Sequence, residues 1–379
     1  PLSWSVIALT LEEWTIIPGI PPAGNIGGLP YLNLSTYASI YRALGKKEDA
    51  LRQALEGTAY TRLPEGMEIP VIPLTWRDLL RIVPATLRMQ ARQKQAVRRL
   101  PSYLAANRAW CQRMRQAIQE AGTGDDLAAL WQDEIEPHVR QSVPAILGSA
   151  MHAADYTTQL RRDLEKLVGP DDAGALTSNL SRGSELLASL GPLVGLARVA
   201  RGEMDPEDYL EAYGHRGPDE FELSAPRPAE DTDWLERQLA DLKRAPVDID
   251  RMLAERQEAF EAAWARFQVA HPRKAKATRG RIDEVAPRAR LREAARSEYA
   301  RDRWIVRGFA LRAGALAGLG DGIFYLTVPE MLDLLAGDAR ATAHIAARRA
   351  THKRYRALPA YPPIICGRFD PFQWAADPE

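Results

Sequence analysis

Long segments with helical periodicity constrain this chain more than any other feature. Residues 75–122 follow one helical pattern that opens with a capping-box-like sequence, Thr75-Trp-Arg-Asp78. We expect this pattern to break near Pro84 and Pro101, because proline removes a backbone donor. Further helical segments are expected at 143–168, 234–242, 249–270 and 292–301. The sequence therefore predicts a mainly α fold.

Strands are expected in only three places. Residues 1–74 are rich in proline and glycine, which predicts an irregular segment with short strands. Short strands are also expected near 322–327 and 362–366. We expect a single domain over 1–379, in which a helical body at 75–379 follows the irregular segment.

The charge balance argues against nucleic acid and membranes as partners. Lysine and arginine together number 50, and aspartate and glutamate together also number 50. The chain therefore has no net charge that would attract it to nucleic acid or to a membrane surface. No uncharged apolar run reaches the ~18 residues of a membrane helix, and no signal peptide is visible. The two cysteines, Cys111 and Cys366, favour neither a disulfide scaffold nor a metal site, and they suit a reducing cytoplasm. Because the chain begins at Pro1 without methionine, we expect a piece of a longer protein.

A short loop, 213–231, concentrates charge. Asp205-Pro-Glu-Asp208 predicts a helix start before it, and Gly214 is expected to end that helix as a C′ glycine. Such dense charge in a turn is either an ion-paired brace or a functional site. The charged residues of the loop include His215, Arg216, Glu220, Glu222, Arg227, Glu230 and Asp231.

A row of arginines is expected on one face of the helix around 292–301. Arg292 and Arg296 are i,i+4 neighbours, and Arg303 and Arg307 continue the same side. Two interpretations remain open. The row either forms salt bridges with the Glu-rich helices or clamps a phosphate, because guanidinium forks match phosphoryl oxygens. A second arginine-rich stretch, within 75–122, is interpreted as a solvated helix face, because it lacks the interleaved aromatics of a nucleic-acid groove.

The loop Tyr213-Gly-His-Arg-Gly-Pro-Asp-Glu-Phe-Glu-Leu-Ser-Ala-Pro-Arg-Pro-Ala-Glu-Asp231 resembles a signature of rifampicin phosphotransferases and their phosphoenolpyruvate-synthase-like relatives. Asp219 stands where that family has glycine, and Pro228 where it has an aromatic residue. Four other segments resemble landmarks in or next to the same central, substrate-binding domain, and they lie at 2–7, 29–35, 322–330 and 358–370.

The resemblance implies the middle part of a three-part enzyme. An ATP-grasp domain, which binds ATP and Mg²⁺, would pass a phosphoryl group to a histidine on a swivelling domain. That domain would deliver the group to a hydroxyl of an apolar, ansamycin-like molecule held by this chain, in a pocket lined by helices such as those at 176–199. No cofactor is expected in this chain, and its partners would be the substrate and those two domains. The alternative is a non-catalytic helical scaffold that docks them.

The resemblance also implies site residues. Glu298, Tyr299 and Arg301 match an Arg-Glu-Tyr-Pro-Lys-like segment of the family, in which Ser297 replaces the arginine and Ala300 the proline. We expect Arg296 and Arg301 to neutralise the transferred group. We expect Glu298 or His215 to assist deprotonation of the acceptor hydroxyl. The expected substrate-binding residues are Arg216, Tyr299 and Trp4.

Overall fold

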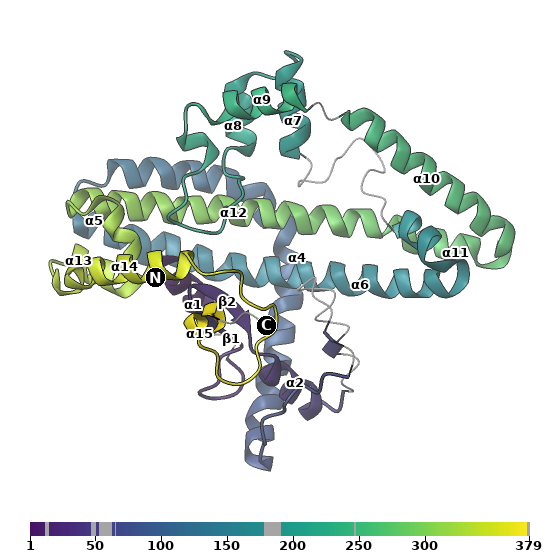
Figure 1. The fold of residues 1–379 in the computed structure, drawn as a ribbon, viewed down its shortest axis with the longest axis horizontal. Coiled ribbons are helices and arrows are strands. Elements are labelled where there is room, and N and C mark those ends of the chain that lie inside the picture. Colours follow the sequence, from purple (N-terminus) through teal and green to yellow (C-terminus); the bar gives the residue numbers. More distant parts are fainter. Residues whose placement is uncertain are drawn as a thin grey trace.

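The computed structural model of the protein describes residues 1–11, 15–46, 51–52, 63–64, 66–177, 191–245 and 248–376. This part of the chain is mainly helical, as expected (Figure 1). The α-helices are α1 (Leu2–Leu11), α2 (Leu34–Ala43), α4 (Trp76–Glu120), α5 (Gly124–Leu130), α6 (Glu136–Thr177), α7 (Gly191–Ala200), α8 (Pro206–Tyr213), α9 (Trp234–Arg244), α10 (Ile249–Ala270), α11 (Pro272–Asp283), α12 (Val285–Leu316), α13 (Val328–Leu335), α14 (Ile345–Arg356) and α15 (Pro371–Ala376). Short π- and 3₁₀-turns are η2 (Trp131–Ile135), η3 (Pro228–Glu230), η4 (Gly320–Tyr325) and η5 (Arg340–His344).

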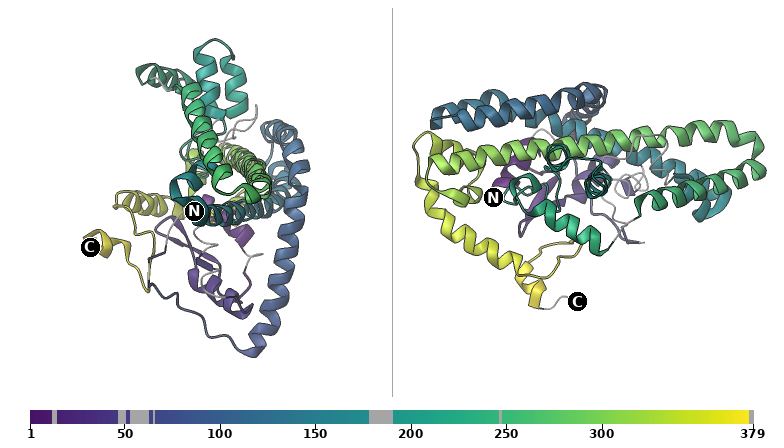
Figure 2. Two further views of the ribbon diagram at one scale, coloured as in Figure 1. Left: turned by 90° about the vertical axis from the view of Figure 1, so that its right-hand side faces the viewer. Right: turned by 90° about the horizontal axis from the view of Figure 1, so that it is seen from above.

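Three long helices, α4, α6 and α12, form the body of the molecule. They pack on one another, and Figures 1 and 2 show α12 running along the length of the body. The largest core lies where α12 meets the second half of α4, η2 and η4, and there the rings of Trp131 and Phe309 lie 5.0 Å apart. A second core joins α6 to α10, around Phe260 and Phe267. The apolar faces predicted by the helical periodicity are thus buried against each other.

The prolines of α4 do not end the helix. Its capping box at Thr75 and Asp78 is confirmed, but the expected breaks at Pro84 and Pro101 are wrong, because both prolines lie inside a continuous helix that bends (Figure 1). Ile82 and Leu100, next to the two prolines, are fully buried. This burial offsets the hydrogen bond that each proline removes from the helix.

The N-terminal segment contains the two strands, β1 (Ala23–Ile26) and β2 (Leu29–Leu32), which confirms part of the strand prediction. They pair antiparallel, with Ala23 opposite Leu32 and Ile26 opposite Leu29. The turn between them uses two glycines, Gly27 and Gly28, at positive φ, which matches the twist of a tight hairpin.

The other two strand predictions are wrong. Residues 320–325 form the 3₁₀-turn η4, and 362–366 form bends and coil. In η4 the apolar side chains of Ile323 and Phe324 are buried in the main core, next to α12. A short apolar run does not distinguish a strand from another kind of buried segment. Here the run belongs to a buried turn.

The elements around loop 213–231 lie on one side of α12. Figures 1 and 2 show α7, α8 and α9 on the opposite side of α12 from the β-hairpin. The loop leaves α8, passes along α12 and ends at η3 before α9 begins. Among the helices described above, none is long and apolar enough to cross a membrane.

Candidate functional site

One carboxylate joins the loop to the arginine row of α12. Glu220 is only 4% exposed, and its two oxygens accept from Arg216 Nε at 2.6 Å and from Arg296 Nε at 3.1 Å. The side chain of Arg296 is nevertheless 50% exposed. Arg296 is thus held at its Nε while half of its side chain stays exposed, which suits a cation that meets an incoming anion.

Two aromatic rings extend this exposed corner. The Arg296 guanidinium lies over the ring of Phe221, 5.6 Å from its centre, and Phe221 lies 5.6 Å from the ring of Tyr299. Phe221 is exposed and Tyr299 half-buried. An accessible cation beside two rings can bind a molecule that is apolar and carries a negative group.

His215 contacts the residue next to Arg296. Its Nε2 lies 2.9 Å from the Ser297 hydroxyl oxygen, and the imidazole is fully buried. Burial, followed by the positive charges of Arg301 and Arg216, lowers the pKa of His215 to about 2. The imidazole is therefore neutral near pH 7 and is a weak base.

Glu298 and Arg301 form an ion pair that is largely buried. Their closest nitrogen and oxygen lie 3.3 Å apart, and Glu298 also accepts from Asn107 Nδ2 at 2.9 Å. Arg301 is 4% exposed and donates at 3.4 Å to the carbonyl oxygens of Glu211 and Ala212, at the end of α8. Arg301 thus fixes Glu298 and the C-terminus of α8 rather than facing solvent.

A buried polar cluster next to this pair escaped the sequence analysis. Asp302 accepts from Tyr103 at 2.5 Å, from Asn107 at 2.9 Å and from His138 at 3.2 Å. The His138 ring stacks on Trp110, and its Nε2 also lies 2.8 Å from the Asn107 side-chain oxygen. Since both partners of Nε2 are acceptors, Nε2 carries a proton. Burial, reinforced by Asp302, raises the pKa of Tyr103 well above its ordinary value.

The remaining arginines of the row brace the loop. Arg307 pairs with Glu230 at 2.8 Å and donates to the carbonyl oxygen of Leu223, while Arg303 donates to that of Phe221. From within the loop, Arg227 donates to the carbonyl oxygens of Asp219 and Ala225. Carbonyl oxygens of alternate loop residues are thereby satisfied by guanidinium groups. The predicted carboxylate partners in the Glu-rich helices are wrong for Arg296 and Arg307, whose partners, Glu220 and Glu230, belong to the loop.

Gly214 is needed at the loop entrance for close packing. It caps α8 with φ −62°, a right-handed conformation, so the prediction of a C′ glycine is wrong. A Cβ there would lie 2.3 Å from the Leu210 carbonyl oxygen and 2.6 Å from the Ala229 Cβ. The turn from α8 into the loop therefore has no room for a side chain.

The start of α1 also reaches the loop. The Ser3 hydroxyl donates to Glu222 at 2.8 Å and accepts from the Leu223 amide at 3.0 Å. The hydroxyl of Ser5 accepts from the amide of Val328, at the start of α13. Trp4 lies between these two serines and is half-buried. The segment at 2–7 thus contacts two other segments with family resemblance, 213–231 and 322–330.

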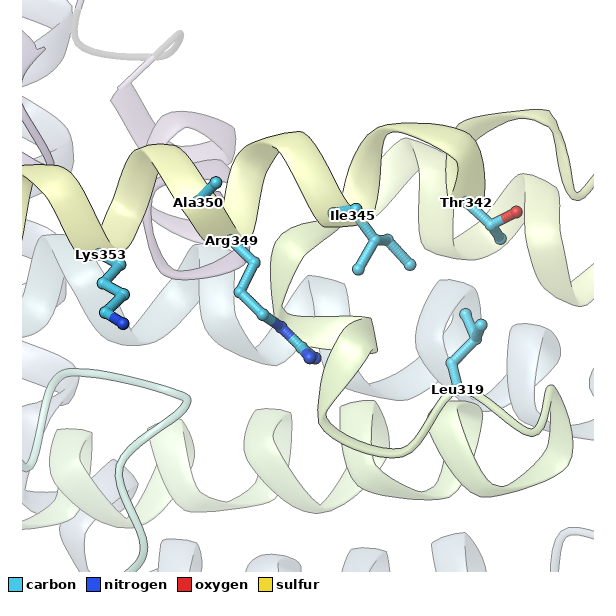
Figure 3. Close-up of a pocket in the computed structure, with 7 residues that line it drawn as sticks. Leu319, Thr342, Ile345, Arg349, Ala350 and Lys353 are labelled. Carbon is cyan, nitrogen blue, oxygen red and sulfur yellow. The ribbon is translucent and has the colours of Figure 1, made fainter.

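Two hollows of the described residues lie away from the open corner. One, of about 640 Å³, is lined by Leu319 and by residues of η5 and α14 such as Arg349 and Lys353 (Figure 3). The other, of about 210 Å³, lies between Ile16, α4 and Pro144. Neither is lined by Arg296 or Arg301. Most of the apolar segment expected to line a cavity, 178–190, lies outside the described residues.

Comparison with known proteins gives no match: neither the protein-family models nor the curated proteins include one that is significantly similar to this chain. Within the described ranges, no group of three or more His, Cys, Asp or Glu side chains could hold a metal ion. The functional interpretation therefore depends on the geometry around α12 and on the motif resemblance.

Proposed function

We propose that this chain is the substrate-positioning part of an ATP-dependent phosphotransferase, which passes a phosphoryl group to a hydroxyl of an apolar, ansamycin-like molecule. One observation carries the proposal. Two stretches that resemble the phosphotransferase family, 213–231 and 297–301, contact each other through His215 and Ser297, and Arg296, next to the second stretch, pairs with Glu220 of the first. The two stretches are far apart in the sequence. If their resemblance to the family were a coincidence, there would be no reason for them to meet in the fold.

The geometry assigns different roles to the two arginines. Arg296 is half exposed, so it would meet the incoming phosphoryl group, with Tyr299 and Phe221 contacting the apolar part of the acceptor. Arg301 is buried on Glu298 and would act as a positioning residue. Glu298 is favoured over His215 for accepting the hydroxyl proton, because a histidine with a pKa of about 2 is a weak base.

The phosphoryl donor would be a phosphohistidine on a separate swivelling domain. ATP and Mg²⁺ would bind to an ATP-grasp domain outside this chain, and we expect the chain alone to be inactive. We place this reaction in the cytoplasm, which supplies ATP. Its reducing environment suits the two free cysteines, of which Cys111 is buried and Cys366 exposed.

The test is to reconstitute the chain with an ATP-grasp and a phosphohistidine domain and to follow AMP release with an ansamycin. Arg296→Ala should lower turnover about a hundredfold, because one charge that stabilises the transition state is lost. Arg251→Ala, which removes an exposed arginine of α10, is the matched control and should leave turnover unchanged. Equal turnover of both variants would remove Arg296 from the mechanism.

A second candidate, a non-catalytic helical scaffold, is favoured by one observation. Arg303 and Arg307 are buried and donate to the loop backbone, so much of the arginine row has a bracing role. A scaffold would dock the ATP-grasp and swivelling domains without binding an acceptor. Thermal unfolding with and without an ansamycin separates the two, because a ligand that binds the native state raises the melting temperature by mass action.

A further inference from the structure

The N-terminal end of α4 exposes a row of large apolar side chains. Trp76 is 67% exposed, Leu80 66% and Leu87 57%. Because four and seven residues separate them, these three side chains, the apolar row, lie along one face of the helix. The other face, with Ile82 and Met89, packs into a small core with α2. Single exposed apolar residues are ordinary, but several together on one face mark an interaction site.

The same face of α4 is strongly basic. Residues 79–119 contain nine lysines and arginines and no aspartate or glutamate. Arg81 and Arg88 lie beside the apolar row, Lys94 and Arg98 continue its line along the helix, and all four are exposed. In the described part of the chain, none of these four forms an ion pair with a carboxylate. The chain as a whole has no net charge, but this helix face is positively charged.

The position of α4 leaves this face open. Figure 1 shows the N-terminal half of the helix leaving the helical body, and Figure 2 shows it along an outer edge of the molecule. The apolar row lines neither of the two hollows described above. A small molecule is usually bound in a concave pocket, whereas the convex side of an exposed helix can lie against a flat surface.

We propose that the N-terminal half of α4 docks on an anionic lipid surface. Trp76, Leu80 and Leu87 would enter the boundary between headgroups and acyl chains, where indole rings are enriched. The neighbouring lysines and arginines would bind the anionic headgroups. Nucleic acid would also meet the cations, but it would leave the apolar row in water. The helix would lie in the plane of the surface, and the proposal does not rest on the proposed function.

Flotation of the chain with lipid vesicles tests the docking directly, without substrate or other domains. One set of vesicles contains phosphatidylglycerol and phosphatidylcholine, and the other phosphatidylcholine alone. The wild-type chain should bind the anionic vesicles at least about tenfold more tightly, because each basic residue near such a surface adds to the attraction. Added salt should weaken this binding, because it screens the charges.

Substitutions on α4 separate the apolar contribution from the charged one. Leu80→Gln should weaken binding to the anionic vesicles about tenfold, because an apolar side chain no longer leaves water. Arg81→Gln should weaken it about fivefold, through the loss of one charge. The matched controls are on α10. Val269→Gln replaces an apolar side chain that is 85% exposed, and Arg251→Gln removes an exposed arginine. Both should bind as the wild type does.

The two kinds of vesicle keep the proposal falsifiable even if a variant fails to fold. Binding to anionic vesicles that Leu80→Gln and Arg81→Gln both weaken supports the docking. The proposal is overturned if the wild-type chain does not float with anionic vesicles. It is also overturned if Arg81→Gln weakens binding and Leu80→Gln does not, because the face would then attract any polyanion. Equal losses in the α10 controls would mean adsorption without a site, and they would overturn it as well.

Discussion

The imidazole Nε2 of His215 lies 2.9 Å from the hydroxyl oxygen of Ser297. His215 is the first ionisable residue after α8, and Ser297 lies on the face of α12 that the loop covers. The contact joins the two segments on which the functional proposal depends. Because the imidazole is buried among arginines, it is also the part of the site with the clearest dependence on pH.

Replacing His215 should make stability less dependent on pH. Its pKa is about 2 in the native protein and about 6.5 in the unfolded chain. The unfolded state therefore binds a proton that the native state refuses. His215 therefore leaves the free energy of unfolding unchanged above about pH 6.5. Below that pH it lowers this free energy by up to about 1.4 kcal/mol per pH unit.

Urea unfolding of the wild type and of His215→Gln, between pH 7.5 and 5, measures this effect. The free energy of unfolding should fall less steeply with decreasing pH in the variant. His344→Gln removes an exposed histidine and should follow the wild type. Parallel curves for His215→Gln and the wild type would mean that His215 titrates normally.

Glu220→Ala should strongly destabilise the protein. It removes the only carboxylate that either Arg216 or Arg296 contacts among the described residues. Breaking a buried pair leaves an uncompensated charge and costs about 3–5 kcal/mol. Asp338→Ala, which breaks the exposed pair with Arg340, should cost at most about 1 kcal/mol. Similar losses in chemical denaturation would contradict the buried bridge.

Asn107→Leu tests the buried polar cluster. One side-chain amide donates to Glu298 and Asp302 and lies 2.8 Å from His138 Nε2. A leucine of similar volume leaves these groups without a partner, so we expect a loss of about 2–4 kcal/mol in the free energy of unfolding. Gln116→Leu, on an exposed face of the same helix, should change it by less than about 0.5 kcal/mol.

Two glycine substitutions should have opposite effects. Gly214→Ala places a Cβ within 2.3 Å of a carbonyl oxygen and should cost about 1–3 kcal/mol. Gly280→Ala lies in α11 with nothing within 4 Å of the added Cβ, so it should stabilise that helix by about 0.5–1 kcal/mol. Thermal unfolding of both variants gives the sign directly, and stabilisation by Gly214→Ala would contradict the close packing at α8.

Local signals in the sequence predicted the elements but not their contacts. The capping boxes at Thr75 and at Thr327 were predictable, because the residues that form each of them lie within four positions. The mainly α fold followed from helical periodicity in the same way. The strand prediction at 322–327 is wrong, since the conformation of this apolar run depends on burial against α12.

The buried groups around α12 depend on contacts between distant segments. Asp302 meets Tyr103, Asn107 and His138 across three helices, and no spacing within any one helix marks that meeting. Arg303 was predicted to share a side with Arg296, yet one is fully buried and the other half exposed. Only the path of loop 213–231 decides which arginines it covers.

The most direct measurement is phosphoryl transfer with and without this chain. An ATP-grasp domain and a phosphohistidine domain are supplied with ATP, Mg²⁺ and an ansamycin, and the ansamycin is analysed by mass spectrometry. The account predicts that a singly phosphorylated ansamycin forms when this chain is added and not when it is omitted. No phosphorylated product in the complete mixture, with the histidine domain itself phosphorylated, would contradict it.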